Sequence, residues 1–589
     1  MKILSIYWGI CSSASILVDN VVVAATHEER YSRVKNDDSF PQKAIDYCLK
    51  EAGIKSTDLD YVAIASIHQD FHHQLSRPSL WSIQNYISTQ KYYWKPRLYE
   101  NKNINYLDIV KDLLDYNQYP KDYWRDAEAH PETFSEDREK ILANYLNINV
   151  NKVKRIEHHK AHAYYSYYAS NFRNEKVLAF TIDGHGDGLN ATIGIFNEDG
   201  EYNRVYETNK CNIARIYRFI TLLLGMKPNE HEFKVMGLAP YGKEKYAKKA
   251  YDIFASTLYV DGLDFKWKEE PKDGYYWFRD KLEGIRFDNI AWGLQAWVED
   301  LLVTWVKNSI SEFGISKIVL SGGVAMNIKA MGKIAELDEV KDMFIGGSAS
   351  DESMAISSGI CMAEEVSNNW DHNIFPIKNL YLGQNTTEKE EKKVVELLNK
   401  EKYHIIQNPR AKDIAKHLFD GKVLARCAGR MEFGQRALGN RSILADPKNL
   451  MVKETINTMI KNRDFWMPFA PIIMDKYINK YLINPKNINS EYMTIGFDTT
   501  KEGYKAMTAA CHPADKSARP EMLSKELNSD MYEIMEEFEK LTGRGAILNT
   551  SFNLHGFPIV NTPKEAVYVL ENSWLYGLVL NNFMVIKYD

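Results

Sequence analysis

The first 25 residues combine short apolar runs with tight turns in a pattern that few folds allow. Residues 2–7 predict a strand, residues 9–13 a turn of small side chains, and residues 15–18 and 21–25 two further strands joined by Asp19-Asn20, a hairpin signal. A Rossmann unit would instead place a helix after its first strand. The chain therefore begins with an antiparallel hairpin, which argues against a dinucleotide-binding fold.

This opening resembles the first hairpin of actin-type ATPase domains, whose first turn reaches toward the nucleotide phosphates. The chain has 589 residues, more than one hydrophobic core accommodates, so at least two domains are expected. A polar, turn-rich stretch at residues 366–380 predicts a linker between them. Residues 68–149 are aromatic and polar and predict an insertion. A helical subdomain with its own core is favoured there over a surface that stacks on a sugar-like acceptor.

The composition excludes several classes of function. The formal net charge of -5 argues against nucleic-acid binding as the main activity, and no run of about 18 apolar residues predicts a membrane span. Six scattered cysteines include no CxxC pair, which excludes the common zinc-ribbon spacings and a disulfide framework. The apolar N-terminus fits a buried strand better than a signal peptide. We therefore expect a cytoplasmic protein with no nucleic-acid or membrane partner.

Metal-binding side chains are concentrated between His158 and Gly188. His158 and His162 are four residues apart, so a helix would place both imidazoles on one face. The apolar run at residues 177–182 predicts a strand that ends in Asp183, and Asp351 opens a later helix after a loop of small residues. Together they predict a divalent-cation site. The alternatives are histidines that only pack and an aspartate that only caps its helix.

Two further segments suit phosphate groups. The predicted strand at residues 317–320 runs into Ser-Gly-Gly, and such a turn before a helix presents free backbone N–H groups to phosphate or ribose oxygens. The charged segment at residues 26–41 contains Arg30, Arg33 and Lys35. For this segment a solvated surface loop and a functional loop are weighted equally.

Residues 429–447 gather Arg430, Arg436 and Arg441 among three glycines. Arginine binds phosphate and carboxylate oxygens with paired hydrogen bonds, so an anion-binding cleft is favoured over an ion-pair network with Glu432 and Asp446. Further polar residues follow at Lys461, Arg463, His512, Arg519 and Arg544, and at a predicted strand end at Asn549, Thr550 and Ser551. The amide and hydroxyl groups of that strand end could hold a planar amide-like group.

These stretches together resemble the NodU/CmcH-type O-carbamoyltransferases, the family of the nodulation-factor, cephamycin and aminoglycoside carbamoylating enzymes. In chain order the matching segments are EERYSRVK, HHKAHA, DGHGDG, KVMGLAPYG, SGGVAMN, SASDES, GRMEFGQRALGNRSILADP, MPFAP and LNTSFNLHGFPIV. Each segment is short, but their combination spans almost the whole chain.

The resemblance implies a mixed α/β protein of two domains. Residues 1–375 would be an actin-like domain, similar to the threonylcarbamoyladenosine transferase of tRNA modification, with a metal and a nucleotide site. Residues 376–589 would be a YrdC-like domain that forms carbamoyladenylate from carbamoyl phosphate and ATP, with release of pyrophosphate. The carbamoyl group would pass to a hydroxyl of a small-molecule acceptor, a sugar or natural product. The implied cofactors are a divalent metal, with iron the first choice, and Mg²⁺ with ATP; a homodimer is also considered.

The resemblance also assigns individual residues. The metal ligands would be His158, His162, Asp183 and Asp351. The nucleotide in the first domain would contact Lys35, Gly184, Gly322, Gly323 and Asn327. Carbamoyl phosphate and the adenylate would contact Arg430, Arg463, His512, Arg519, Asn549 and Ser551, with catalytic roles for Lys35, Arg430 and Arg519.

The chain departs from the family pattern at two places. Ile10-Cys11 stand where the family carries His-Asp, whose His is a candidate base for the acceptor hydroxyl; His27 or His185 could replace it. Phe557 stands where an acidic residue is common, so no catalytic role is assigned to it. Two other functions stay open: tRNA threonylcarbamoylation, and a non-enzymatic, actin-fold nucleotide-binding regulator.

Overall fold

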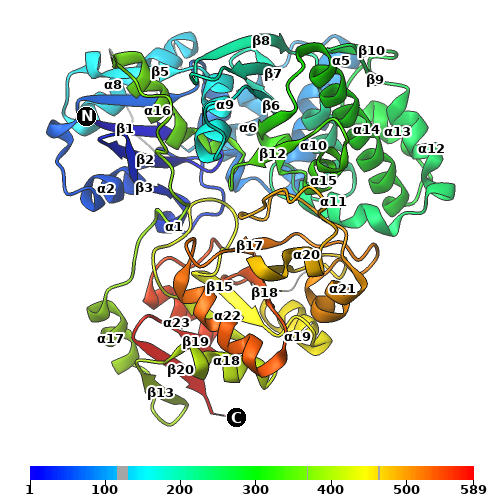
Figure 1. Ribbon diagram of the computed structural model, residues 1–589. Coiled ribbons are helices and arrows are strands. Elements are labelled where there is room, and N and C mark those ends of the chain that lie inside the picture. The colour runs from blue at the N-terminus through cyan, green and yellow to red at the C-terminus, as the bar shows by residue number, and fades with distance from the viewer. Residues whose placement is uncertain (116–129, 368, 462–463, 589) are drawn as a thin grey trace. The chain divides into compact units, whose positions relative to one another are not determined.

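The computed structural model describes residues 1–115, 130–367, 369–461 and 464–588. The chain divides into two compact units, Met1–Lys378 and Asn379–Asp589 (Figure 1). Each unit contains both helices and mixed sheets. The predicted mixed α/β class is therefore confirmed.

The first unit opens with the predicted strands. β1 (Lys2–Tyr7), β2 (Ser13–Val18) and β3 (Val21–His27) are antiparallel, and β4 (Tyr61–Ala65) and β5 (Val153–Ile156) continue in parallel beside β1. The sheet order is β3-β2-β1-β4-β5. Asp19 and Asn20 both have a positive φ, 47° and 65°, because a two-residue hairpin turn needs this conformation and their short polar side chains tolerate it.

A second sheet of the same unit repeats this plan. β6 (Val177–Gly186), β7 (Leu189–Phe196) and β8 (Tyr202–Thr208) are antiparallel, while β11 (Lys317–Ser321) and β12 (Asp342–Ile345) continue in parallel beside β6. The order, β12-β11-β6-β7-β8, is that of the first sheet read from the opposite edge. This duplicated sheet is the actin-like architecture expected for the first unit.

Two buried helices connect the sheets. α9 (His158–Ala169) packs on β6 and β11, α16 (Met354–Val366) packs on β1, β2 and β4, and the two helices pack against each other. On the second sheet, Phe180 of β6 packs edge-on against Trp305 of α14 (Phe287–Phe313). The N-terminal ends of α9 and α16 thereby come close to the ends of β1 and β6.

The described part of the insertion, residues 68–115 and 130–149, is helical. α3 (Phe71–Ser76) and α8 (Phe134–Leu146) contribute side chains to the core of the first sheet. A separate small cluster forms around Trp81 and Tyr86. The described part of the insertion is helical as predicted, but it does not form a separate core, because α3 and α8 pack on the first sheet and the small cluster includes Leu222 from outside the insertion.

The charged segment at residues 26–41 is largely buried, so a solvated loop is the wrong interpretation. Its buried charged residues are Glu28, Glu29, Arg30, Asp37 and Asp38, none more than 6% exposed. Arg77, which follows α3, donates to both Asp37 and Asp38. Burial is tolerated because these charges are paired or accept hydrogen bonds.

The second unit is built on one mixed sheet in the order β13-β20-β19-β14-β15-β18-β16-β17. Its strands are β13 (Tyr403–Gln407), β14 (Leu424–Cys427), β15 (Arg441–Ala445), β16 (Ala470–Met474), β17 (Glu521–Leu523), β18 (Ala546–Ser551), β19 (Gly577–Val579) and β20 (Phe583–Lys587). α18 (Ala411–Phe419) and α22 (Ser529–Thr542) pack together and share a core with the apolar side chains of the sheet.

Candidate metal centre

Four residues from distant parts of the sequence meet in the first unit. His158 and His162 come from α9, Asp183 from β6, and Asp351 from η10 (Asp351–Ser353), the turn that leads into α16. Each offers one ligand atom, and these atoms all lie within 4.8 Å of one another. The structure therefore brings together all four residues that the sequence assigned to a metal.

Local sequence explains how the two imidazoles reach this point. Glu157 caps α9 by accepting the N–H groups of His159 and Lys160, which starts the helix at His158 and sets both ligand histidines on one face. Gly186 passes directly over the His158 ring: a Cβ there would lie 2.2 Å from ring atoms. Only glycine fits this part of the hairpin, which is a reason for its place in DGHGDG.

The distances suit a common cation. Asp183 Oδ2 lies 3.1 Å from His158 Nε2 and 3.2 Å from His162 Nε2, and Asp351 Oδ1 lies 3.4 Å from His162 Nε2. Ligand atoms about 2.1 Å from one ion lie about 3.0–3.4 Å apart in octahedral or tetrahedral geometry. Asp351 Oδ1 is buried yet has no hydrogen-bond partner among the described residues. An acceptor left in this state beside two imidazoles fits a metal ligand.

A second layer of polar groups orients the ligands. Ser66 Oγ lies 3.0 Å from His158 Nδ1 and Ser321 Oγ lies 3.1 Å from His162 Nδ1, so each Nε2 faces the centre. The Tyr7 hydroxyl donates to Asp351 Oδ2 at 2.7 Å, which leaves Oδ1 for a cation. Sequence reasoning missed these three residues. The available signal was a polar side chain at or just after the end of a predicted strand, since Tyr7, Ser66 and Ser321 end or follow β1, β4 and β11.

Asp187 ties three segments together beside this centre. Its carboxylate accepts the backbone N–H groups of His158 at 2.8 Å, Ile67 at 2.9 Å and His68 at 2.7 Å. The start of α9, the turn after β6 and the segment after β4 are thus held in one place. Asp187 belongs to the DGHGDG segment, but its anchoring role was not predicted.

Three of the four groups shift one another's pKa values. Burial alone would lower the pKa of His162, but its hydrogen bond with Asp183 and the nearby carboxylates of Asp183 and Asp351 raise that pKa to about 9. The pKa of Asp183 lies well below its usual range, because its hydrogen bonds with His158 and His162 outweigh its burial. Burial and the Asp183 charge raise the pKa of Asp351. A divalent cation would satisfy both carboxylates directly.

The glycine loop after β11 lies beside the centre. Gly322 has φ 97°, and a Cβ there would lie 2.2 Å from the Ile182 carbonyl oxygen, so glycine is required for this close approach. The Gly323 N–H points at Asp183 Oδ1 at 3.4 Å, and the Gly184 N–H donates to the same atom at 2.6 Å. The structure therefore places these glycines beside the metal centre. Their predicted contact with a nucleotide stays a prediction.

Two other predicted nucleotide contacts have protein partners. Asn327 caps α15 (Ile328–Glu336) and exchanges hydrogen bonds with the Gln295 amide. Lys35 Nζ lies 2.6 Å from Glu230 Oε1. Despite burial, the charges and hydrogen bonds of Lys35 and Lys227 lower the pKa of Glu230 to about 2. A nucleotide at Lys35 would have to compete with this ion pair.

The predicted anion-binding residues of the second unit lie on neighbouring strands and loops. Asn549 on β18 donates to the Ala437 carbonyl at 2.8 Å and to Glu521 Oε2 at 3.1 Å, so it links β17, β18 and the loop between β14 and β15. Ser551 ends β18 and donates to Asn553. Arg430 donates to the Leu382 and Gly383 carbonyls. Arg519 is partly buried and lies just before β17. His512 is buried and accepts a hydrogen bond from the Ala514 N–H. Arg463 lies outside the described residues.

Two arginines that were grouped with the anion cleft have other roles. Arg441 is fully buried, and its guanidinium donates to five backbone carbonyls, those of Gln384, Ala428, Gly429, Asn440 and Asn561. Arg544 pairs with Asp446. Arg441 is therefore a structural cross-link. The prediction that its guanidinium helps to form an anion-binding cleft is wrong, because backbone carbonyl oxygens already occupy its donors.

The two candidate bases differ in access. His27 is 1% exposed and its Nδ1 lies 3.4 Å from Cys11 Sγ. Burial lowers the pKa of His27 well below its usual value. His185 is exposed and lies two residues from Asp183; burial and the charge of Arg215 lower its pKa. Phe557 is 49% exposed.

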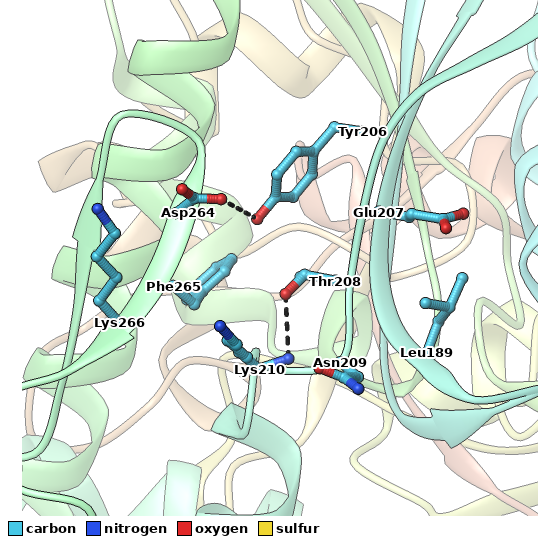
Figure 2. Close-up of a pocket in the computed structure, with 9 residues that line it drawn as sticks. All are labelled: Leu189, Tyr206, Glu207, Thr208, Asn209, Lys210, Asp264, Phe265 and Lys266. Carbon is cyan, nitrogen blue, oxygen red and sulfur yellow. Dashed lines mark hydrogen bonds between the residues drawn. The ribbon is translucent and has the colours of Figure 1, made fainter.

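A separate groove lies at the edge of the second sheet. Figure 2 shows it between β8 and the hairpin of β9 (Leu258–Asp261) and β10 (Asp264–Trp267), with a volume of about 350 Å³. The Tyr206 hydroxyl donates across it to Asp264 at 3.2 Å. None of the residues predicted for catalysis, metal or nucleotide lines this groove.

The fold and the site define a two-unit α/β protein whose actin-like unit carries a buried His/Asp group able to hold a divalent cation. The chain belongs to the carbamoyltransferase family: residues 2–360 match the carbamoyltransferase N-terminus and residues 415–587 the carbamoyltransferase C-terminus. This confirms the resemblance stated from the sequence. In the part of the chain that the structure describes, no helix has the length and apolarity needed to cross a membrane.

Three relatives show how far the similarity extends. A protein of Methanocaldococcus jannaschii is 27% identical over 96% of this chain and 96% of its own length. Nodulation protein NolNO of Sinorhizobium fredii is 27% identical over 98% of this chain and 78% of its own. The 3'-hydroxymethylcephem-O-carbamoyltransferase of Amycolatopsis lactamdurans is 29% identical over 29% of this chain and 32% of its own. Family and relatives together support carbamoyl transfer.

Proposed function

We propose that this protein is a cytoplasmic O-carbamoyltransferase that uses carbamoyl phosphate and ATP and acts on a hydroxyl group of a sugar or natural product. The match of both halves to the carbamoyltransferase family supports the reaction class. The observation that carries the proposal is the convergence of four ligand atoms on one point of the first unit, with Asp351 Oδ1 left without a hydrogen-bond partner among the described residues.

The reaction balances in two stages. Water cleaves carbamoyl phosphate to carbamate and phosphate, and a carbamate oxygen attacks the α-phosphorus of Mg²⁺-ATP, so that carbamoyladenylate forms and pyrophosphate leaves. In the proposed assignment Arg430 and Arg519 neutralise phosphate charge, together with Arg463 and His512. Asn549 and Ser551 hold the carbamoyl end, since both lie on β18 next to this loop region.

In the second stage the oxygen of the acceptor hydroxyl attacks the carbamoyl carbon. The hydroxyl proton is lost, the bond between that carbon and the adenylate oxygen breaks, and AMP leaves. We assign this stage to the first unit. Gly184, Gly322 and Gly323 would present backbone N–H groups to the adenylate phosphate, and Lys35 and Asn327 would contact the nucleotide. His185 is the accessible candidate for the base.

The residues present fit a resident divalent cation. His158, His162, Asp183 and Asp351 would hold it, and their nitrogen and carboxylate donors suit iron, zinc or manganese, with iron as our assignment. When bound, the cation supplies positive charge that neutralises phosphate and polarises the carbonyl group. Tyr7, Ser66 and Ser321 keep the ligand atoms turned toward it.

The proposal is tested by supplying the purified protein with ATP and carbamoyl phosphate. We expect pyrophosphate to appear without added threonine. A strict requirement for threonine and bicarbonate would instead indicate threonylcarbamoylation, and no pyrophosphate with either set of substrates would contradict both. Mass spectrometry of metabolites from producing cells with and without the protein then identifies the acceptor by a carbamoyl mass gain.

A further inference from the structure

Two arginines of α10 (Ile213–Leu223) in the first unit carry positive charge without an ion pair. Arg215 and Arg218 are three residues apart, so the helix brings their side chains together on one face. Among the described residues neither guanidinium pairs with a carboxylate. Arg77 and Arg204 of the same unit, in contrast, each contact two or more carboxylates. The α10 pair therefore stands out as positive charge that the protein leaves unmatched.

The helix gains no stability from this pair of charges. Arg215 lies in the first turn of α10, where the helix dipole disfavours a cation, and a like charge three residues on is also unfavourable. Partial burial and then the charge of Arg218 lower the pKa of Arg215, and no carboxylate charge opposes them. Glu232 acts on Arg218 from a distance, but its carboxylate accepts the Asn229 N–H at 2.7 Å. Charge placed at such a cost indicates an anion from outside the protein.

The start of α10 is fixed beside the ligand-bearing end of β6. The buried Asn190, which follows the hairpin turn after β6, donates to the Asn209 carbonyl at 3.0 Å and accepts the Cys211 N–H at 2.9 Å. α10 also packs against β6. After burial, the charge of Arg215 has the largest effect on the pKa of His185 and lowers it, which shows that the two side chains are close neighbours. Both are exposed, so a ligand can reach them.

An aromatic ring from the insertion holds the second arginine. The guanidinium of Arg218 lies 5.9 Å from the ring centre of Tyr86 on α4 (Ile83–Thr89). Tyr86 is itself fixed, because its ring packs against Trp81 and its hydroxyl donates to the Pro78 carbonyl at 3.2 Å. A cation–π contact of this kind uses none of the N–H donors of the guanidinium. Arg218 is thus positioned while its hydrogen-bond donors stay available for a ligand.

Two guanidinium groups side by side select an oxyanion. Each can donate paired hydrogen bonds to a carboxylate or a phosphate, whereas a neutral sugar would leave both charges unmatched. In the proposed function the adenylate phosphate is assigned to the backbone N–H groups of the glycine loops, and the acceptor has only His185. Resting on that function, we propose that Arg215 and Arg218 bind a carboxylate or phosphate group of the acceptor, so that the protein carbamoylates anionic acceptors in preference to neutral ones.

The test compares acceptors that share one sugar ring and differ in charge. The full chain is supplied with ATP, carbamoyl phosphate and either glucose, glucuronate or glucose 6-phosphate. Mass spectrometry measures the carbamoylated sugar, and pyrophosphate release is followed separately. The variants are Arg215→Gln and Arg218→Gln, which remove one charge each, and Arg215→Lys, which keeps the charge. Arg279→Gln is the matched control, because Arg279 is half-exposed in the same unit and already pairs with Asp280.

We expect the wild type to use an anionic sugar with a kcat/KM at least ~10-fold above that for glucose, and the better of the two distinguishes carboxylate from phosphate. Each glutamine variant should lose at least ~10-fold in kcat/KM for that sugar, mainly through KM, and change by less than about twofold with glucose. Arg215→Lys should lose less. Pyrophosphate release should stay within about twofold. Unfolding midpoints should stay equal or rise, since a like-charge contact is removed.

The proposal is overturned if the wild type uses glucose as well as the anionic sugars, or if both glutamine variants keep the preference of the wild type. It is also overturned if the variants lose glucose and anionic sugars in parallel, because the arginines then serve the adenylate or the fold. If the wild type releases no pyrophosphate, the proposed function fails first. Calorimetric titration with the three sugars tests the arginine site without turnover: equal affinities, or affinities that Arg215→Gln leaves unchanged, contradict it.

Discussion

Both units bury carboxylate oxygens, but they give them different surroundings. In the first unit Asp183 and Asp351 face two imidazoles within 4 Å. In the second unit Glu432 and Glu521 accept only from backbone N–H groups and Asn549 among the described residues. The first arrangement could hold a divalent cation, and outer hydrogen bonds orient its side chains. In the second, backbone N–H groups and one amide hold the two glutamates between neighbouring strands and loops.

This contrast separates the two proposed stages. Carboxylate and imidazole atoms that converge on one point call for positive charge. Damage to the first cluster should therefore affect metal binding and transfer, and damage to the second unit should affect formation of the adenylate. The following changes test this division from the largest expected effect to the smallest.

The largest effect should come from His162→Ala. Loss of one of four ligands should remove most of the bound metal and slow carbamoyl transfer about 10³-fold, equal to several kcal/mol of transition-state stabilisation. Pyrophosphate release should stay within about twofold, because the adenylate is assigned to the other unit. Elemental analysis measures the bound metal, and mass spectrometry of the product measures carbamoyl transfer. His130→Ala, at an exposed histidine, is the control; parallel loss of pyrophosphate release would contradict two separable sites.

A medium effect, on stability, is expected at Glu28. Among the described residues this buried carboxyl has no basic side chain in its hydrogen bonds. Burial raises its pKa to about 7, although it accepts the Ala44 N–H at 2.8 Å. The folded protein therefore holds a proton that the unfolded chain releases near its ordinary pKa. This contribution to stability is present at low pH and is lost as the pH rises through 7.

Glu28→Gln removes the ionisable carboxyl, so the protein no longer loses stability as the pH rises through 7. It should stabilise the protein by up to ~3 kcal/mol at pH 8 and by much less at pH 5, because the pKa of Glu28 is raised from 4.5 to about 7 in the folded protein. Urea midpoints at the two pH values measure the difference. Glu198→Gln, at an exposed glutamate, should show no such pH dependence. A destabilised Glu28→Gln protein at pH 8 would mean that burial without a partner does not dominate here.

Much of the first unit could be predicted from its sequence, because strand ends carry the chemistry. β1 and β4 have the predicted bounds, and the strand before Asp183 and the spacing of His158 and His162 located the ligand set. Asp351 lies far away in sequence, and only its small-residue loop marked it. What could not be predicted is the hydrogen-bond layer of Tyr7, Ser66 and Ser321, since it depends on how the strands are placed in three dimensions.

The second unit was harder to predict for a physical reason. Arginine has the same sequence signature whether it binds a ligand or backbone carbonyls. Arg441 was grouped with Arg430 because both lie on one segment punctuated by glycines, yet Arg441 is fully buried. Glu432 was considered only as an ion-pair partner, and Glu521 gave no signal at all. Burial of an unpaired acceptor leaves no trace in composition or periodicity, so it can be recognised only from coordinates.

The smallest effect should come from Tyr7→Phe, which tests whether the outer layer matters to the first cluster. The Tyr7 hydroxyl binds Asp351 Oδ2, so its loss frees that carboxylate to rotate away from the ligand position. Outer-layer changes typically weaken metal binding by about 10–100-fold, and we expect the lower end because the imidazoles keep their serine partners. Competition with a chelator measures the metal Kd. Tyr246→Phe, at a tyrosine that is 63% exposed, is the matched control. Unchanged metal affinity in Tyr7→Phe would show that Asp351 is held by its position on η10 alone, and that the outer layer shapes the fold without tuning the metal site.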